Sequence, residues 1–178
     1  LIQFTLPVPA AIILAGLLAA AFAFLIGLPV LRLKGDYLAI ATLGFAEIIR
    51  ALFQYDKLGP ITNGSNLLRK FPTYSSILFP FAVVAACIAI ILLLINSSYG
   101  RAFKAIRDDE VAAEAMGVNL FLHKQLAFVI SSFFAGVGGA LLAMYQTTVQ
   151  ANAFKSSMTY EILLIVVIGG MGSVTGSV

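Results

Sequence analysis

Four long stretches without a charged side chain restrict what this 178-residue chain can fold into. They are residues 1–31, 71–100, 125–154 and 162–178. Roughly 20 apolar residues suffice for a helix to cross the hydrocarbon core of a bilayer, and a helix satisfies its own backbone hydrogen bonds there. Charged residues make up only 11% of the chain, whereas soluble domains contain about 25%. These features predict an all-α fold, a polytopic transmembrane helix bundle.

Both ends of the sequence are interpreted as internal to a longer protein. The chain does not begin with Met, and the apolar run Ile162–Val178 continues to its last residue. The first apolar stretch is longer than the core of a signal peptide, about 7–15 residues, and no basic segment precedes it. We therefore expect residues 1–178 to be a single transmembrane domain that is truncated at both ends.

Five membrane segments are expected, and the second differs from the others. They are about Pro9–Leu31, Tyr37–Phe53, Ile77–Ile95, Gln125–Tyr145 and a segment that begins near Tyr160 and enters Gly169–Ser173. The second segment is short and contains Gly44, Glu47 and Arg50. It is expected to be either an inner helix that is shielded from lipid or an interrupted helix.

Small residues recur at helical spacing in two of these segments. They form the rows Ala15, Ala19, Ala23 and Gly27 in the first segment, and Ser132, Gly136 and Ala140 as well as Ala135 and Gly139 in the fourth. Such rows let another helix approach closely, so they predict helix contacts. For the first row, the alternative is an alanine-rich helix without a special partner. The lone Cys87 is expected to be a packing residue, because one cysteine forms neither an internal disulfide nor a metal site.

The distribution of lysine and arginine favours one orientation in the membrane. Six of them are expected on one side, namely Arg32, Lys34, Arg101, Lys104, Arg107 and Lys124, and four on the other, namely Lys57, Arg69, Lys70 and Lys155. Basic residues are enriched in cytoplasmic loops. The side with six is therefore expected to be cytoplasmic, which places Gln54–Ser76 outside.

A charged island, residues 100–117, interrupts the apolar sequence and holds four of the eight acidic residues. Arg101, Lys104 and Arg107 are three residues apart and therefore share one helical face. We expect them to continue the preceding membrane span into the headgroup region.

A second short helix is expected in the rest of the island. Asp108 or Asp109 suits its N-cap, and Glu110 would complement the helix dipole in the first turn. Small apolar side chains follow, and Gly117 suits the position just after the helix. Such a helix can enter a groove on a soluble partner. The alternative is a solvated loop with favourable local charges.

Three separated motifs carry a family resemblance. In chain order they are KGDYLAIATLGFAEIIR, AFKAIRDDEVAAEAMGVN and IGGMGSVTG, between about Leu31 and the C-terminus. They resemble the LivM-type permease subunits of bacterial branched-chain amino-acid ABC importers. The resemblance implies a multi-pass permease domain of the bacterial inner (plasma) membrane. It would move branched-chain or related small amino acids by alternating access, with residues 97–124 as its cytoplasmic coupling loop.

The resemblance also implies partners: cytoplasmic ATPase subunits, a homologous partner permease and a periplasmic substrate-binding protein. The residues expected to couple the chain to the ATPase are Arg107, Asp108, Asp109, Glu110, Ala112, Ala113 and Gly117. Of these, Ala112, Ala113 and Gly117 match the AA-x-x-x-G part of the docking loop of such permeases, and we expect Ala113 to face the ATPase groove. Val111 stands where the general motif has Glu. The chain contains no G-x-x-x-x-G-K-[ST] string, so ATP hydrolysis is assigned to a separate subunit and the chain is not expected to be an enzyme.

Candidate residues of the solute path are Thr42, Gly44, Glu47, Gly169 and Gly170. An ionisable group such as Glu47 within the membrane is a functional candidate by default. It could equally form a structural pair with Arg50. The glycines could expose polar backbone to a solute, and close helix packing would explain them as well.

Other functions remain open at this stage. A related permease could carry urea or another small polar solute, and an ATP-independent secondary transporter or channel would need no ATPase partner. An intramembrane hydrolase is disfavoured, because the single histidine, His123, is far in sequence from the serines of GMGSVTGS. No cofactor or metal is expected. The net charge of +3 suits loops beside anionic lipid and does not indicate nucleic-acid binding.

Overall fold

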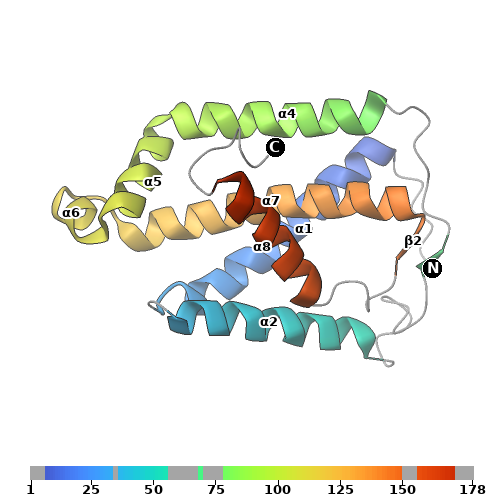
Figure 1. The fold of residues 1–178 in the computed structure, drawn as a ribbon, viewed down its shortest axis with the longest axis horizontal. Helices are drawn as coiled ribbons and strands as arrows, with labels where there is room; N and C mark the ends of the chain where they lie inside the picture. Colours follow the sequence, from blue (N-terminus) through green and yellow to red (C-terminus); the bar gives the residue numbers. More distant parts are fainter. Residues whose placement is uncertain (1–6, 34–35, 56–67, 70–77, 150–155, 171–178) are drawn as a thin grey trace.

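The computed structural model describes residues 7–33, 36–55, 68–69, 78–149 and 156–170. Within these ranges the chain is mainly helical (Figure 1). In chain order the elements are α1 (Val8–Val30), α2 (Asp36–Gln54), β1 (Leu68–Arg69), α4 (Leu78–Asn96), α5 (Ser98–Asp108), α6 (Glu110–Ala115), α7 (Leu120–Gln146), β2 (Thr148–Val149) and α8 (Ser156–Gly169). The predicted helix bundle is confirmed.

Three helices of the described part, α1, α4 and α7, are long and apolar enough to cross a membrane. The other two predicted segments are also helical. α2 continues without a break through Gly44, so the interrupted-helix alternative is wrong. α8 has 14 residues and ends at Gly169, while Met171–Ser173 of the predicted segment lie outside the described residues.

α7 begins at Leu120, five residues before the predicted start of the fourth segment. The reason is local, because the Asn119 side chain accepts a hydrogen bond from the Leu122 N–H at 3.1 Å and caps the helix. The last residues of the predicted coupling loop, including His123 and Lys124, therefore form the first turns of a long membrane helix. His123 and Lys124 therefore belong to a helix and not to a loop.

α1 and α7 pack against each other in antiparallel directions and form the centre of the described fold (Figure 1). Gly16 of α1 lies beside Phe133 and Val137, and Gly27 lies beside Gln125 near the other end of α7. The predicted contact along the α1 row of small residues is confirmed, with Ala23 and Gly27 buried. An alanine-rich helix without a partner is ruled out.

One of the two small-residue rows on α7 makes this contact. A Cβ atom on Gly136 would lie 2.7 Å from the Ala19 Cβ and 2.9 Å from the Ala15 carbonyl oxygen, so only glycine permits the approach. Ala140 of the same row packs beside the apolar core. The other row has no such role in the described residues, because Ala135 is exposed and a Cβ on Gly139 would meet nothing within 4 Å.

The apolar core lies where α1, α4 and α7 meet. Its buried members are Ile12, Val137, Leu141 and Met144. Cys87 of α4 packs against them, which confirms it as a packing residue. α4 itself has no buried residue, so most of its apolar surface is available to lipid or to other protein.

α5 does not continue the preceding span, which corrects the expectation for the basic half of the island. α4 ends at Asn96, and Ser97 caps a new helix by accepting a hydrogen bond from the Gly100 N–H at 3.3 Å. The Ser97 hydroxyl also donates to the Leu94 carbonyl at 2.6 Å. Gly100 lies so close to the Ile95 carbonyl that a Cβ would collide with it, which explains why the chain can turn here. α5 consequently runs off at an angle (Figure 1).

The two ends of the bundle carry different connections. α5 and α6 gather at one end of the long helices, and β2 lies at the other (Figure 1). The antiparallel pair β1–β2, which sequence analysis did not predict, joins Leu68 to Val149 and Arg69 to Thr148. At the opposite end the Arg32 guanidinium carbon lies 5.7 Å from the centre of the Phe121 ring. Arg32 and the island therefore share one end, as the charge distribution predicts.

Candidate functional site

The short helix α6 begins as the sequence predicts. The Asp109 carboxylate accepts hydrogen bonds from the backbone N–H groups of Val111 at 2.9 Å and Ala112 at 3.1 Å. Glu110 lies in the first turn, where a negative charge complements the helix dipole. Of the two residues predicted as possible N-caps, Asp109 is the one that caps α6. Asp108 instead ends α5 and forms an ion pair with Arg107 at 3.0 Å.

The end of α6 is fixed by backbone geometry. Gly117 has φ +86°, a left-handed conformation that glycine adopts without the penalty of a side chain. The Val118 N–H donates to the Ala113 carbonyl at 3.1 Å, and the Gly117 N–H donates to the Glu114 carbonyl at 2.9 Å. These two bonds form a Schellman motif. The predicted role of Gly117 as the residue that ends the helix is confirmed.

The exposed face of α6 differs from the predicted one. Val111 and Met116 are 77% and 85% exposed, and Ala112 is exposed as well. Ala113 is only 4% exposed and is turned toward its own chain, so the expectation that it faces outward is wrong. The exposed apolar side chains of this segment are Val111, Ala112, Ala115 and Met116, which we call the outer face of α6.

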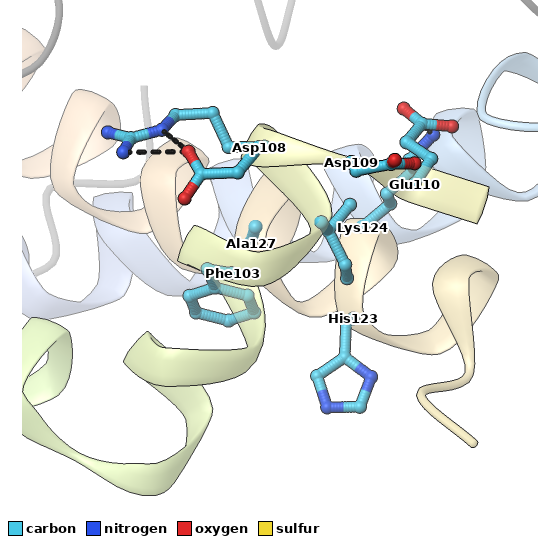
Figure 2. Close-up of a pocket in the computed structure, with 9 residues that line it drawn as sticks. Phe103, Asp108, Asp109, Glu110, His123, Lys124 and Ala127 are labelled. Atoms are coloured by element: carbon cyan, nitrogen blue, oxygen red, sulfur yellow. Dashed lines mark hydrogen bonds and ion pairs between the residues drawn. The ribbon is translucent and has the colours of Figure 1, made fainter. Parts of the chain in front are cut away.

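A pocket of about 280 Å³ separates α5 and the start of α6 from α7. Figure 2 shows its side chains, with the His123 ring directed away from the carboxylates. The pocket is lined by Phe103, Ile106, Arg107, Asp108, Asp109, Glu110, His123, Lys124 and Ala127. It brings together four of the predicted coupling residues, Arg107 through Glu110, while Ala112, Ala113 and Gly117 lie beyond it in the same segment.

Two side chains of α7 contact the island across this pocket. The Lys124 ammonium group lies 2.6 Å from the Glu110 carboxylate. The His123 ring lies 6.2 Å from the rings of both Tyr99 and Phe103 on α5, measured between ring centres. His123 Nδ1 is 2.8 Å from the Asn119 carbonyl, within its own helix. His123 therefore acts as a packing ring between helices.

A larger, mainly apolar cavity of about 540 Å³ lies between α1, α2 and α7. Of the predicted solute-path residues, Thr42 lines it, and the Thr42 hydroxyl donates to the Ala39 carbonyl at 2.9 Å. Ser132 brings a second hydroxyl to the cavity from α7. The other lining residues are Leu18, Ala19, Phe22, Ala23, Ile26, Phe45, Ala46, Ile49, Leu52, Phe128, Ala135 and Gly136.

The other path candidates lie apart from this cavity. Gly44 is exposed, and a Cβ there would meet nothing within 4 Å. Glu47 is half-exposed and forms an ion pair with Arg50 at 2.8 Å, so the predicted pair is present. Gly169 is the last residue of α8, and Gly170 has φ +103° where the helix ends.

Gln125 is a site residue that sequence analysis missed. It is only 6% exposed, and its amide nitrogen donates to the Phe24 carbonyl of α1 at 2.9 Å. The other amide atom, Oε1, is buried without a hydrogen-bond partner. An amide at the start of a long apolar helix was the available signal, because polar side chains in membrane helices commonly bond to a neighbouring helix. Within the described ranges, no group of three His, Cys, Asp or Glu side chains is placed to hold a metal ion.

Comparison with known proteins agrees with this architecture. A family described as "Branched-chain amino acid transport system / permease component" matches residues 1–178. The chain is 37% identical over 194 residues to the high-affinity branched-chain amino acid transport system permease protein LivM of Escherichia coli, with 90% of this chain and 45% of that protein covered. A probable LivM of Methanocaldococcus jannaschii is 28% identical over 178 residues, with 93% and 52% covered.

A sugar permease is also similar to the chain. The L-arabinose transport system permease protein AraH of Escherichia coli is 30% identical over 151 residues, with 82% of this chain and 45% of AraH covered. The chain spans about half the length of the curated relatives it matches. No solved structure matches it. Because the family match extends over the whole sequence, the chain belongs to the family of branched-chain amino acid transport system permease components.

Proposed function

We propose that this chain is part of the permease subunit of an ABC importer that moves branched-chain amino acids across the bacterial inner membrane. ATP hydrolysis is supplied by separate cytoplasmic ATPase subunits. A homologous permease completes the membrane part, and a periplasmic binding protein delivers the solute. Three helices able to cross a membrane and the relatives named for this transport support the proposal.

The observation that carries the proposal is the outer face of α6. Apolar side chains on a charged segment outside the membrane helices are unfavourable in water, and Val111 and Met116 are 77% and 85% exposed. Two caps fix the short helix, at Asp109 and at Gly117. A preformed knob with small apolar side chains suits a groove on a soluble partner, because little conformational entropy is lost when it docks.

The cavity between α1, α2 and α7 is our candidate for part of the solute path. Its apolar walls suit an aliphatic side chain, and the hydroxyls of Thr42 and Ser132 can contact a polar group. Alternating access would change the packing of these three helices around the solute. Among the predicted path residues, Thr42 is the one whose position supports this role.

An arginine at Ala112 tests the docking face. Ala112→Arg should leave permease abundance unchanged, because the site is exposed and arginine is a good helix former. It should abolish co-purification of the ATPase and uptake of L-leucine. The matched control is Ala105→Arg, the same change at an exposed alanine of α5, which should retain both. Full docking and uptake by Ala112→Arg would reject the coupling-helix proposal and favour an ATP-independent transporter or channel.

The solute needs its own measurement, because AraH is named for a sugar. Uptake of radiolabelled L-leucine by the complete importer should be inhibited by excess isoleucine and valine and should be unaffected by L-arabinose. Uptake of arabinose in place of leucine would show that the family assignment holds and that the proposed solute is wrong. Urea should be measured alongside as the small polar alternative.

A further inference from the structure

The first two turns of α7 make three contacts, which reach α1, the residues just after it, and α6. Phe121 lies under the Arg32 guanidinium at the end of α1, Lys124 pairs with Glu110 of α6, and Gln125 bonds to Phe24 within α1. At 100° per residue, Phe121 and Gln125 point to nearly the same side of the helix, and Lys124 points to the neighbouring side. The base of α7 therefore holds α6 with one side and α1 with the other.

The contact with α6 is a short ion pair at the first residue of that helix. The Lys124 ammonium and the Glu110 carboxylate are 2.6 Å apart, and the Lys124 side chain is 31% exposed. Glu110 is the first residue of α6, directly after the capping Asp109, so its position is set by the helix rather than by a free loop. The ion pair therefore connects the start of α6 to the base of α7.

The contact with α1 is a buried hydrogen bond to backbone. The Gln125 amide donates to the Phe24 carbonyl at 2.9 Å, and the side chain occupies the space that the missing Cβ of Gly27 leaves. The other end of the amide, Oε1, is buried without a partner. An unpaired buried acceptor is unfavourable, so an apolar side chain would serve stability better here. The amide is better explained by the specific link that it makes to α1.

We propose that Lys124 and Gln125 are positioning residues that clamp α6, α7 and α1 together, so that a movement of the docked α6 reaches the α1 wall of the cavity. This inference rests on the proposed function and names the residues that connect its two sites. α1 contributes Leu18, Ala19, Phe22, Ala23 and Ile26 to that cavity, and Phe24 lies among them. Adjacent residues of one rigid helix thus connect the docking segment to the candidate solute path.

The test measures the ATP hydrolysed per leucine transported by the complete importer, reconstituted in proteoliposomes with its ATPase and binding protein. Lys124→Gln and Gln125→Met should each raise this ratio about two- to fivefold, because the loss of a partly exposed ion pair, or of one hydrogen bond, changes an equilibrium by about that factor. Both variants should still co-purify the ATPase, since the outer face of α6 is unchanged. Glu110→Lys should raise the ratio as Lys124→Gln does.

Matched controls separate this role from a general effect on folding. Lys104→Gln removes an ammonium of α5 that forms no ion pair in the described residues, and Ser131→Ala removes an α7 hydroxyl that donates only to Phe128 of its own helix. Neither should change the ratio. The double variant Glu110→Lys with Lys124→Glu restores the pair with reversed charges and should lower the ratio again toward that of the wild type.

Four other outcomes would overturn the clamp or the proposed function. A wild-type ratio in both Lys124→Gln and Gln125→Met would reject the clamp and leave the proposed function intact. Loss of ATPase co-purification in Lys124→Gln would assign the pair to docking, which also rejects the clamp. An unchanged high ratio in the charge-reversed double variant would do the same. A wild-type complex that neither binds an ATPase nor takes up leucine would overturn the proposed function, and the clamp with it.

Discussion

Individual glycines of this chain have distinct physical roles that their sequence context does not reveal. Gly136 lies against the backbone of α1, whereas Gly139, three residues later on the same helix, faces open space in the described structure. Gly117 is needed for its backbone conformation rather than for space, since its φ is +86° and nothing lies within 4 Å of a Cβ placed there. Close packing therefore explains Gly136, whereas backbone conformation explains Gly117.

Alanine at Gly136 should destabilise the chain, and alanine at Gly139 should not. The new Cβ at position 136 would push against Ala19 and against the backbone at Ala15, so α1 and α7 must separate. Such overpacking typically costs about 1–3 kcal/mol. Gly139→Ala should be neutral or slightly stabilising, because alanine favours helix. Thermal unfolding of the purified chain in detergent measures both. Equal midpoints for the two variants would contradict the assigned contact.

The pair of Glu47 and Arg50 is local to α2 and should be energetically coupled. Glu47→Gln and Arg50→Gln should each lower the unfolding midpoint or the membrane abundance, because each removes the ion pair at 2.8 Å. The double variant should recover part of the loss, with a coupling free energy of about 0.5–1 kcal/mol. Arg50→Lys, which keeps the charge, is the control. Additive effects would remove the pair as a stabilising interaction and would return Glu47 to the solute-path candidates.

At the scale of elements, the island is a sequence of short helices fixed by caps rather than a solvated loop. Ser97, Asp109 and Asn119 cap α5, α6 and α7 in turn through their side-chain oxygens. A two-turn helix is marginal in isolation, so α6 depends on its caps and on its contact with α7. Its outer face keeps a fixed shape only while the caps at both ends of the helix remain formed.

Substitution of Gly117 should weaken this element and its docking. Gly117→Ala forces a left-handed conformation that costs about 1–2 kcal/mol for a residue with a Cβ. The end of α6 should fray, and the fraction of permease that retains its ATPase through purification should fall. Gly117→Asn should be milder, since asparagine tolerates this conformation better. Gly138→Ala, at a glycine of α7 with open space around it, is the control. Undiminished ATPase retention in Gly117→Ala would show that the end of α6 does not contribute to docking.

For the whole molecule, the antiparallel contact of α1 and α7 determines which of the segments between helices lie at the same end of the bundle. Arg32 meets Phe121 at the end that carries the island, and β1 pairs with β2 at the other. The six basic residues assigned to one side by the charge distribution include Arg32, Arg107 and Lys124, which the structure places at the island end. Which end faces the cytoplasm is a prediction from the distribution of charge.

Labelling of single cysteines in intact cells tests this orientation. In a Cys87→Ala background, a cysteine at Lys104 on the exposed surface of α5 should resist a membrane-impermeant thiol reagent, because it should face the cytoplasm. A cysteine at Tyr145, exposed at the other end of α7, should react. Both sites should react after the cells are made permeable, which is the control. The reverse pattern in intact cells would invert the topology and exclude a cytoplasmic docking role for α6.

The sequence by itself determined the features that depend on neighbours along the chain. Charge-free runs predicted the membrane helices, Asp108 or Asp109 together with Gly117 predicted the two ends of α6, and the spacing of Glu47 and Arg50 placed the two charges within reach of each other. The tertiary structure decided what depends on the relative placement of helices. It buried Ala113 and placed Gly136, rather than Gly139, against α1. It also joined Lys124 to Glu110 and Gln125 to Phe24, pairs that are 14 and 101 positions apart in the sequence. Helical periodicity identifies which residues share a face, but it does not specify the helix that packs against that face.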